Sequence, residues 1–282
     1  MAFGYRRTPL YQGFSLLLSE PGIYGLFGRN GSGKSTLLLL LAGLLFPKGG
    51  RIDVGGHMPA KRHPGFLEQV YIVPEEFHLP NLRPAQLARS QSVFYPNFSA
   101  SAFDEYLGIF EVPEHSSFEQ MSLGQKKKAA IAFALATLTP VLLLDEPTNG
   151  LDIISRDQFR AIMARPEQRQ RIVLISTHQA HDLEQIMSHI LFIDGASLAL
   201  SATMAELGRA LRMGVVPDAT ALAQVPDLLY SEALGEQQAF VAVNRARVPG
   251  PVHMELLYKA LSLRKDAVLA VLESKETAHV QP

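Results

Sequence analysis

The chain has 282 residues, 47% of them hydrophobic, which is enough to build a substantial core in one large or two modest domains. The 26 Lys and Arg residues almost balance the 27 Asp and Glu residues, and the net charge of -1 excludes a global field that would attract nucleic acid or anionic lipid. Cysteine is absent, which excludes disulfides and thiolate metal sites and favours a cytosolic setting.

Neither the start of the chain nor its apolar runs predict a targeting or membrane-spanning segment. Residues 1–14 include Arg6 and Arg7 but no apolar stretch after them, unlike a secretory signal. The apolar run 37–46 is half as long as the roughly 20 residues that a membrane span requires. We therefore expect no transmembrane helix.

The first part of the chain predicts an α/β core. Residues 23–27 form a short apolar run that ends in a Gly-rich turn, and the Leu-rich stretch 35–45 has no period-two alternation, which indicates a strand, a loop and a buried helix. Similar short strands are predicted at 70–73, 141–144 and 172–176. Their continuous hydrophobicity is typical of parallel strands that are covered on both faces.

A helical insertion is predicted between residues 80 and 120. Residues 84–95 and 101–110 indicate helices, with Asn97 or Ser99 as the cap of the second helix, and no strong strand lies between them.

The core is predicted to close with antiparallel strands. Asp194-Gly195 is a favoured two-residue turn between the apolar residues 190–193 and the stretch 197–200. We place the domain boundary near residue 204. Beyond it the sequence predicts a weak helix at 204–211, an alternating strand at 239–243 and a helical stretch at 254–272.

Residues 28–35 have the P-loop pattern of Gly, four residues and then Gly-Lys-Ser, between a strand and a helix. The backbone N–H groups of such a loop and the N-terminus of the following helix attract phosphate oxygens. Lys34 would reach the β- and γ-phosphates, and Ser35 would give Mg²⁺ a hydroxyl ligand. The alternative is a plain Gly-rich connection, which the flanking strand and helix disfavour. The predicted nucleotide-binding residues of this stretch and the position after it are Gly28, Asn30, Gly31, Ser32, Gly33, Lys34, Ser35 and Thr36.

Residues 141–146 form an apolar strand that ends in two acids, and they resemble a Walker B motif. Asp145 would hold Mg²⁺ through water, and Glu146 would accept a proton from the water that attacks the γ-phosphate. An acidic strand terminus without catalytic function is the alternative. A P-loop with these acids does not distinguish between kinases, GTPases, helicases and transporters as the functional class.

Residues 121–125, Met-Ser-Leu-Gly-Gln, resemble the signature of the ABC ATPase family, usually Leu-Ser-Gly-Gly-Gln. The resemblance implies that Ser122, Gly124 and Gln125, with the N-terminus of the next helix, bind the γ-phosphate held by the opposite subunit, so that two subunits sandwich two ATP molecules. Leu123 departs from the commonest signature. The segment alone also fits an ordinary helix that Ser122 caps. We expect the basic run 126–128 to be a solvated first turn.

Two further segments follow in the family's order. Residues 147–152 are similar to its D-loop, and residues 175–178 are similar to its switch-histidine segment. The resemblance implies that Asp152 communicates across the dimer interface and that His178 is a catalytic residue that binds the γ-phosphate and positions the attacking water. Alternatives are an ordinary strand-end histidine at 178 and a switch role for His181.

Two positions complete the predicted site. Tyr5 lies where the family has an aromatic residue that stacks on adenine, with Tyr11 or a purely structural ring as alternatives. Glu75 stands where the family's Q-loop usually has Gln. We hypothesise that Glu75 is a metal ligand together with Ser35 and Asp145, although its carboxylate adds a negative charge beside Mg²⁺.

The resemblance covers residues 1–204 and implies a P-loop NTPase core with a mixed, mainly parallel sheet, antiparallel β elements and a helical subdomain at about 80–138. Residues 205–282 would form a small C-terminal accessory region. The implied function is ATP hydrolysis, with ATP and Mg²⁺, that powers transport of an unknown substrate through a separate membrane permease.

The partners implied are the permease and a second ATPase subunit, in a homodimer or a heterodimer, on the cytoplasmic face of the membrane. Nucleic acid is not expected. The Leu-containing signature resembles those of exporter ATPases. A groove beside the Q-loop would grip the permease, and its candidate residues also fit the core of the helical subdomain: Phe77, Leu79, Phe94 and Tyr95.

Two alternative functions are disfavoured. A soluble ABC ATPase that acts on nucleic acid or ribosomes usually has long coiled coils or two cassettes in one chain, whereas this chain has one compact cassette. A P-loop kinase of small molecules would leave residues 121–125 and 149–152 unexplained.

Overall fold

The computed structural model describes residues 1–6 and 8–273. Contacts divide the chain into two compact units, the first made of Met1–His178 and Leu191–Ala199 and the second of Gln179–Ile190 and Leu200–Pro282. The domain limit at residue 204, which follows the predicted antiparallel strands, stays a prediction. Within the described residues, no helix has the length and apolar character needed to cross a bilayer.

A six-stranded sheet in the order β4-β5-β6-β3-β7-β8 organises the α/β core. Its first four strands are parallel, as their uninterrupted apolar runs predict. In the register, Ser176 at the end of β6 lies opposite Asp145 of β5 and Leu26 of β3, so the carboxyl ends of the three strands reach one edge. The strands are β3 Gly22–Gly28, β4 Val70–Val73, β5 Val141–Asp145, β6 Ile172–Ser176, β7 His189–Asp194 and β8 Ser197–Thr203.

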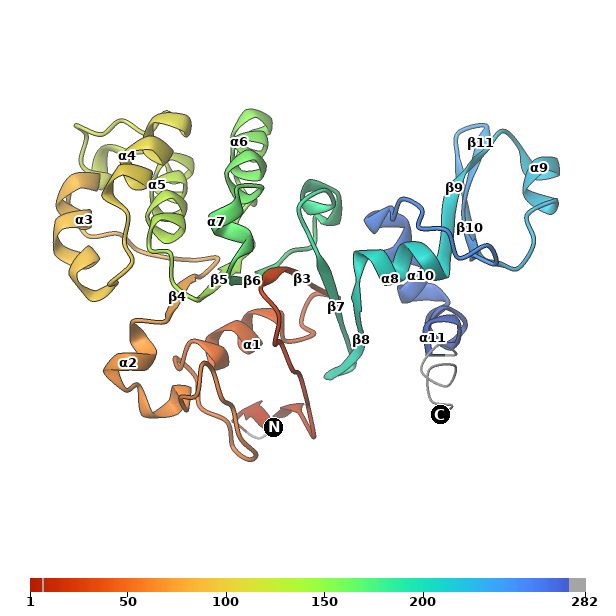
Figure 1. Ribbon diagram of the computed structural model, residues 1–282, viewed down its shortest axis with the longest axis horizontal. Helices are drawn as coiled ribbons and strands as arrows, with labels where there is room; N and C mark the ends of the chain where they lie inside the picture. The colour runs from red at the N-terminus through yellow and green to blue at the C-terminus, as the bar shows by residue number, and fades with distance from the viewer. Residues whose placement is uncertain (7, 274–282) are drawn as a thin grey trace. The chain divides into compact units, whose positions relative to one another are not determined.

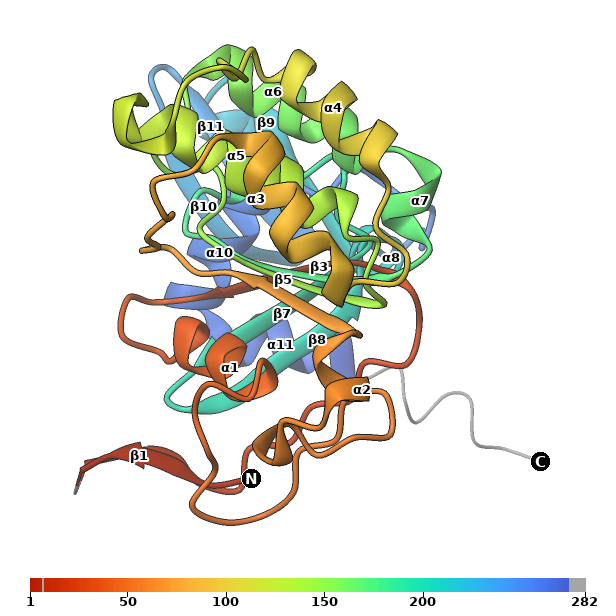
Figure 2. The ribbon, with the colours of Figure 1, turned by 90° about the vertical axis from the view of Figure 1, so that its left-hand side faces the viewer.

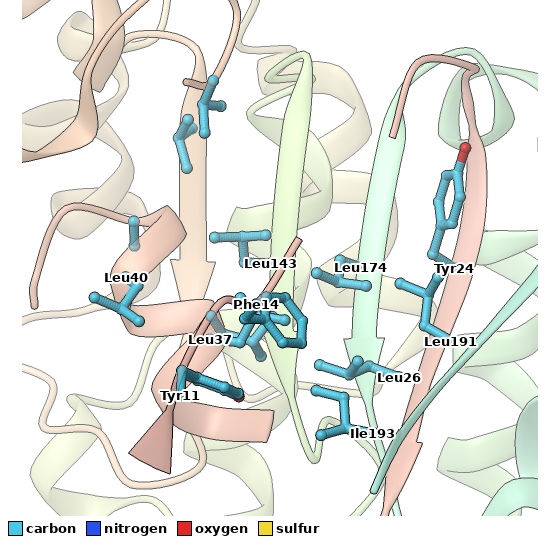
Figure 3. Packing of buried hydrophobic residues seen from close by; sticks show 14 of the residues in the cluster. Tyr11, Phe14, Tyr24, Leu26, Leu37, Leu40, Leu143, Leu174, Leu191 and Ile193 are labelled. Atoms are coloured by element: carbon cyan, nitrogen blue, oxygen red, sulfur yellow. The ribbon is translucent and has the colours of Figure 1, made fainter. Parts of the chain in front are cut away.

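Helices cover the parallel strands on both faces (Figures 1 and 2). Helix α1 (Lys34–Leu41) contacts β3, β5 and β6 on one side, while α5 (Leu123–Ala136) contacts β4 and α7 (Pro166–Arg169) contacts β3 and β6 on the other. Figure 3 shows Leu37 and Leu40 of α1 packed toward Leu143 and Leu174 of the sheet. Burial of these side chains removes apolar surface from water and fixes the helix on the sheet.

Helix α1 is shorter than the predicted helix 35–45. It ends at Leu41, and Gly43 adopts a left-handed backbone with φ of 66° while its N–H bonds to the carbonyl of Leu40. A left-handed glycine after the last turn ends many helices because it redirects the chain at little steric cost.

Other elements of the first unit lie outside the predicted α/β pattern. An antiparallel hairpin that was not among the predicted elements forms near the N-terminus. These elements are β1 Phe3–Tyr5, β2 Thr8–Tyr11, the 3-10 helices η1 Pro59–Lys61 and η3 Phe118–Gln120, α2 Pro64–Leu67 and α6 Ile153–Met163.

The helical insertion contains α3 (Pro84–Gln91), the 3-10 helix η2 (Ser92–Phe94) and α4 (Ala100–Ile109), followed by α5. The predicted helix 84–95 is therefore an α-helix that ends at Gln91 and a 3-10 turn, and Tyr95 has the extended backbone favoured before Pro96. Ser99 caps α4, and its Oγ accepts a hydrogen bond of 3.2 Å from the N–H of Ala102. This confirms Ser99 as the cap.

An aromatic cluster joins the insertion to the sheet. The ring of Phe133 in α5 is fully buried and lies 5.6 Å from Tyr71 of β4, 5.2 Å from Phe98 and 5.8 Å from Phe103 of α4. Aromatic pairs at such separations stabilise a core beyond the area that they bury. Phe133 is thus the centre of the contact between insertion and sheet.

The strands β7 and β8 are joined by Gly195-Ala196, one residue later than the predicted Asp194-Gly195 turn. Both residues have positive φ, 54° and 70°, which is the backbone that a tight two-residue hairpin requires.

The second unit has a three-stranded antiparallel sheet in the order β10-β11-β9. The predicted helix 254–272 is two helices, because Arg264 leaves helical backbone. The elements are η4 Ala180–Leu183, α8 Met204–Ala210, β9 Leu211–Val216, α9 Ala219–Ala223, β10 Leu228–Leu234, β11 Gln237–Val243, α10 Met254–Leu263 and α11 Lys265–Glu273.

We predict that Phe133→Ala lowers the free energy of unfolding of the first unit by about 3–5 kcal/mol, because it removes a buried ring and leaves a cavity. Phe94→Ala is the matched control, since Phe94 is 65% exposed and its loss should change stability by less than about 0.5 kcal/mol. Chemical denaturation measures both. Equal losses in the two variants would show that Phe133 does not anchor the insertion.

Candidate nucleotide site

A pocket of about 490 Å³ lies at the sheet edge where β3, β5 and β6 end. It brings together residues that are far apart in the sequence: most of the P-loop, Tyr5, Glu75, Glu146 and His178. Its lining is formed by Tyr5, Leu10, Asn30, Gly31, Gly33, Lys34, Ser35, Thr36, Glu75, Glu146 and His178. Most residues predicted to bind ATP thus face one volume.

The P-loop takes its shape from glycine backbones that other residues rarely adopt. Gly31 and Gly33 have φ of 79° and 103°, and helix α1 begins immediately afterwards at Lys34 without a side-chain cap. A Cβ on Gly33 would clash with the hydroxyl of Tyr11, which donates a hydrogen bond of 2.8 Å to the Gly33 carbonyl. The first N–H groups of α1 therefore remain available to an anion.

Lys34 is buried inside this loop. Its Nζ donates hydrogen bonds of 2.9 Å to the carbonyl of Gly28 and 3.3 Å to that of Arg29. Burial lowers the pKa of Lys34, and the charges of Glu146, Asp145 and Glu75 act in the opposite direction.

The cradle fits a phosphate group. The buried Oγ of Ser32 has no hydrogen-bond partner, and a phosphate oxygen would supply an acceptor for it. The Ser32 hydroxyl, the Lys34 ammonium group and the N–H groups at the start of α1 together provide the hydrogen-bond donors and positive charge that a phosphate requires.

Glu146 and His178 form a hydrogen-bonded pair at the pocket. Nδ1 of His178 lies 2.9 Å from Oε1 of Glu146, and the backbone N–H of His178 donates to Oε2 at 3.4 Å. Glu146 has a left-handed backbone with φ of 47°, held by its N–H bond to the carbonyl of Ser176. A carboxylate fixed in this way can take a proton from a water molecule at the γ-phosphate.

The three predicted metal ligands differ in their surroundings. Ser35 and Glu75 line the pocket, while Asp145 is buried and accepts a hydrogen bond from the hydroxyl of Ser176. Among the described residues no cluster of three or more acids or histidines is placed to hold a metal. Mg²⁺ is commonly held by one or two protein oxygens together with phosphate and water, so the oxygen donors here fit it in the presence of a nucleotide.

The signature and the D-loop lie together but outside this pocket. Ser122 caps α5 by accepting from the N–H of Gln125, whose side chain accepts from the N–H of Ser122, so the helix-cap alternative describes the local structure correctly. A Cβ on Gly124 would lie 3.6 Å from the carbonyl of Gly150 in the D-loop. The described lining of the pocket includes neither Ser122 nor Asp152.

Asp152 has a local role at the start of α6. Its Oδ1 accepts a hydrogen bond of 2.7 Å from the N–H of Ser155, and this bond lowers the pKa of Asp152. The carboxylate is therefore held as a charged helix cap next to the signature.

The geometry distinguishes the tyrosine alternatives. Tyr5 is 51% exposed at the pocket, and its hydroxyl lies 3.1 Å from Oγ1 of Thr36. Tyr11 is fully buried under Gly33, where its ring cannot stack on a base. Tyr5 is thus the ring that is accessible to adenine. His181 is exposed and is not part of the described pocket lining.

Lys127 was not predicted to be a functional residue. The prediction that residues 126–128 form a solvated turn is wrong for the side chain of Lys127. Lys127 is only 5% exposed, and its Nζ donates to the carbonyl of Glu146 at 2.6 Å and to that of Asn149 at 2.9 Å. In the sequence, it is the middle member of three identical lysines, so nothing distinguishes it.

Comparisons with known proteins show which family the chain resembles. The model of the family described as ABC transporter matches residues 11–149. The chain is 30% identical to the ABC transporter ATP-binding protein YtrB of Bacillus subtilis, over 68% of this chain and 66% of that protein. It is also 30% identical to the thiamine import ATP-binding protein ThiQ of Vibrio vulnificus, over 69% of this chain and 86% of ThiQ.

The cytochrome c biogenesis ATP-binding export protein CcmA of Rhodospirillum rubrum is 34% identical over 60% of this chain and 74% of CcmA. The chain belongs to the ABC transporter ATP-binding proteins. The chain spans 66% of the length of YtrB.

The fold is also that of a solved ABC structure. The dimeric post-hydrolysis state of the ATP-binding cassette MJ0796, bound to ADP and Pi, aligns with a TM-score of 0.61 at 20% identity, over 72% of this chain and 94% of that chain. The P-loop NTPase architecture predicted from the motifs is confirmed.

We predict that Gly33→Ala weakens ATP binding by at least about tenfold, because the new methyl group displaces Tyr11 and distorts the cradle. Gly56→Ala is the control: φ of Gly56 is also positive, 81°, but it has open space around it. The control should cost about 1 kcal/mol of stability and leave affinity unchanged. Calorimetric titration with ATP distinguishes them, and equal affinity in both variants would contradict the role of Gly33.

Proposed function

We propose that this ABC transporter ATPase works as a dimer on the cytoplasmic face of a membrane, where Mg²⁺-dependent ATP binding and hydrolysis power a separate permease. The observation that supports this most is the division of the site. The P-loop, Glu146 and His178 share one pocket, whereas Ser122 and Gly124 lie outside it, beside the D-loop. In this proposal a second copy brings a signature to each ATP.

In this proposal each group has a distinct task. Lys34 and the N–H groups at the start of α1 hold the phosphates, and Tyr5 stacks on adenine. Ser35 and Asp145, with Glu75, hold Mg²⁺, which stabilises the charge of the phosphates. Glu146 accepts the proton of the attacking water, and His178 keeps that carboxylate in place.

The test is Glu146→Gln in the full chain, which keeps the shape of the side chain but removes the base. We predict that hydrolysis falls roughly 10² to 10⁴-fold while ATP binding remains, so that the variant accumulates as an ATP-bound dimer. Light scattering with size-exclusion chromatography measures the dimer. A variant that stays monomeric and hydrolyses ATP at the wild-type rate would contradict both the base and the composite site.

We assign the contact with the permease to a groove near β4. A groove of about 360 Å³ is lined in part by Leu67, Tyr71 and Phe94. Phe94 is 65% exposed and Val93 is 74% exposed, so the interpretation of Phe94 as subdomain core is wrong. Tyr95 packs on the ring of Phe133, and burial raises its pKa, which agrees with a structural role for that residue. An exposed aromatic side chain beside a groove is typical of a protein contact.

We predict that Phe94→Glu reduces the fraction of chain bound to membranes of the source organism by about tenfold, because it places a charge in an apolar contact. Leu234→Glu is the control, since Leu234 is 54% exposed on β10, far from this groove in the sequence. Both variants should retain ATPase activity. Membrane sedimentation equal for Phe94→Glu and wild type would favour the alternative of an ABC ATPase without a membrane partner.

Export stays a prediction from the Leu123-containing signature, because the import protein ThiQ and the export protein CcmA both match the chain. A homodimer is the simplest assembly, since one chain supplies every motif.

A further inference from the structure

Lys127 is a buried cation close to the reaction site. It lies in the second turn of α5 between Lys126 and Lys128, which are both more accessible to solvent. Its ammonium group donates to two backbone carbonyls, those of Glu146 and Asn149. A buried charge with only neutral partners costs several kcal/mol, so a compensating negative charge is expected nearby.

The compensating negative charge comes from the carboxylates of the site. Burial lowers the pKa of Lys127, and the negative charges of Glu75, Glu146 and Asp145 act in the opposite direction. Glu75 is also the position where this chain departs from the usual Gln of its family. The amide of Asn149 donates to Glu75 Oε1 at 3.2 Å, while Lys127 holds the carbonyl of the same Asn149. Asn149 therefore connects the additional acid to the buried lysine.

The bond from Lys127 also fixes the backbone of the base. Glu146 has φ of 47°, a left-handed conformation that is strained for a residue with a side chain. Its carbonyl accepts from Lys127 and from the N–H of Asn149, and its carboxylate then meets Nδ1 of His178. A lysine at this carbonyl holds the peptide unit that directs the catalytic carboxylate.

The same lysine belongs to the helix that begins with the signature. Lys127 lies two residues after Gln125, whose side chain completes the cap at Ser122. In the proposed dimer this helix end would contact the ATP held by the other copy. Lys127 thus connects two parts of the proposed dimer. One is the helix end that would contact the ATP of the other copy, and the second is Glu146, which would act on the ATP of its own copy.

We propose that Lys127 is a positioning residue for hydrolysis: it ties the signature helix to the backbone of Glu146 and offsets the negative charge that Glu75 adds. This inference rests on the proposed function. It predicts energetic coupling between positions 75 and 127, which a lysine that served only to hold the fold together would not show.

A double-mutant cycle on the full chain tests it, with wild type, Lys127→Met, Glu75→Gln and the double variant. ATP affinity and single-turnover hydrolysis are measured for each, together with thermal stability. Lys127→Met should lower the hydrolysis rate about 30-fold and change ATP affinity less than about threefold. In that background Glu75→Gln should restore the rate about tenfold, because it removes the uncompensated charge. Lys126→Met, one residue away, is the matched control and should hydrolyse ATP at the wild-type rate.

The opposite results overturn the proposal. If the two rate effects simply multiply, or if Lys127→Met lowers affinity and stability as much as rate, Lys127 has only a structural role. Lys127→Gln, which keeps a donor but not the charge, takes its place in the cycle if the Met variant does not fold. A wild-type chain without ATPase activity would contradict the proposed function as well, whereas an active wild type with no coupling contradicts the role of Lys127 alone.

Discussion

The parallel pairing of β3, β5 and β6 is the constraint on which the site depends. Their hydrogen-bond register places Leu26, Asp145 and Ser176 side by side, so the segments that follow these strands emerge at one edge. Those segments are the P-loop, the acid pair and the switch histidine. The apolar packing of α1 against the same strands holds the P-loop at this edge, since α1 begins with Lys34 (Figure 3).

Charge balance is the second constraint on this edge. Three carboxylates, those of Glu75, Asp145 and Glu146, interact with two buried lysines, Lys34 and Lys127. Lys34 comes from the P-loop, which receives the phosphates in the proposed function, and Lys127 comes from the helix that begins with the signature. Phosphates bring more negative charge to the first lysine, so the second gains importance as a fixed cation behind the acids.

Much of this arrangement could be predicted from the sequence, because the apolar strands and the short motifs are local signals. The strands at 70–73 and 172–176 and the cap at Ser99 agree with the structure residue for residue. Features that depend on tertiary contacts could not be predicted: the burial of one lysine among three at 126–128, and the exposure of Phe94 while Tyr95 packs on Phe133. The turn lies at Gly195-Ala196, one residue after the predicted pair, and local turn preferences alone do not specify that position.

In the proposed function, one chain contains two halves of different sites and hydrolysis requires two copies. The most direct measurement is the ATPase rate per chain of the purified wild-type protein as its concentration is lowered at saturating ATP and Mg²⁺. A composite site predicts that the rate per chain falls as the dimer dissociates and reaches a plateau at high concentration. A rate per chain that stays constant over the range in which sedimentation shows only monomers would contradict the claim.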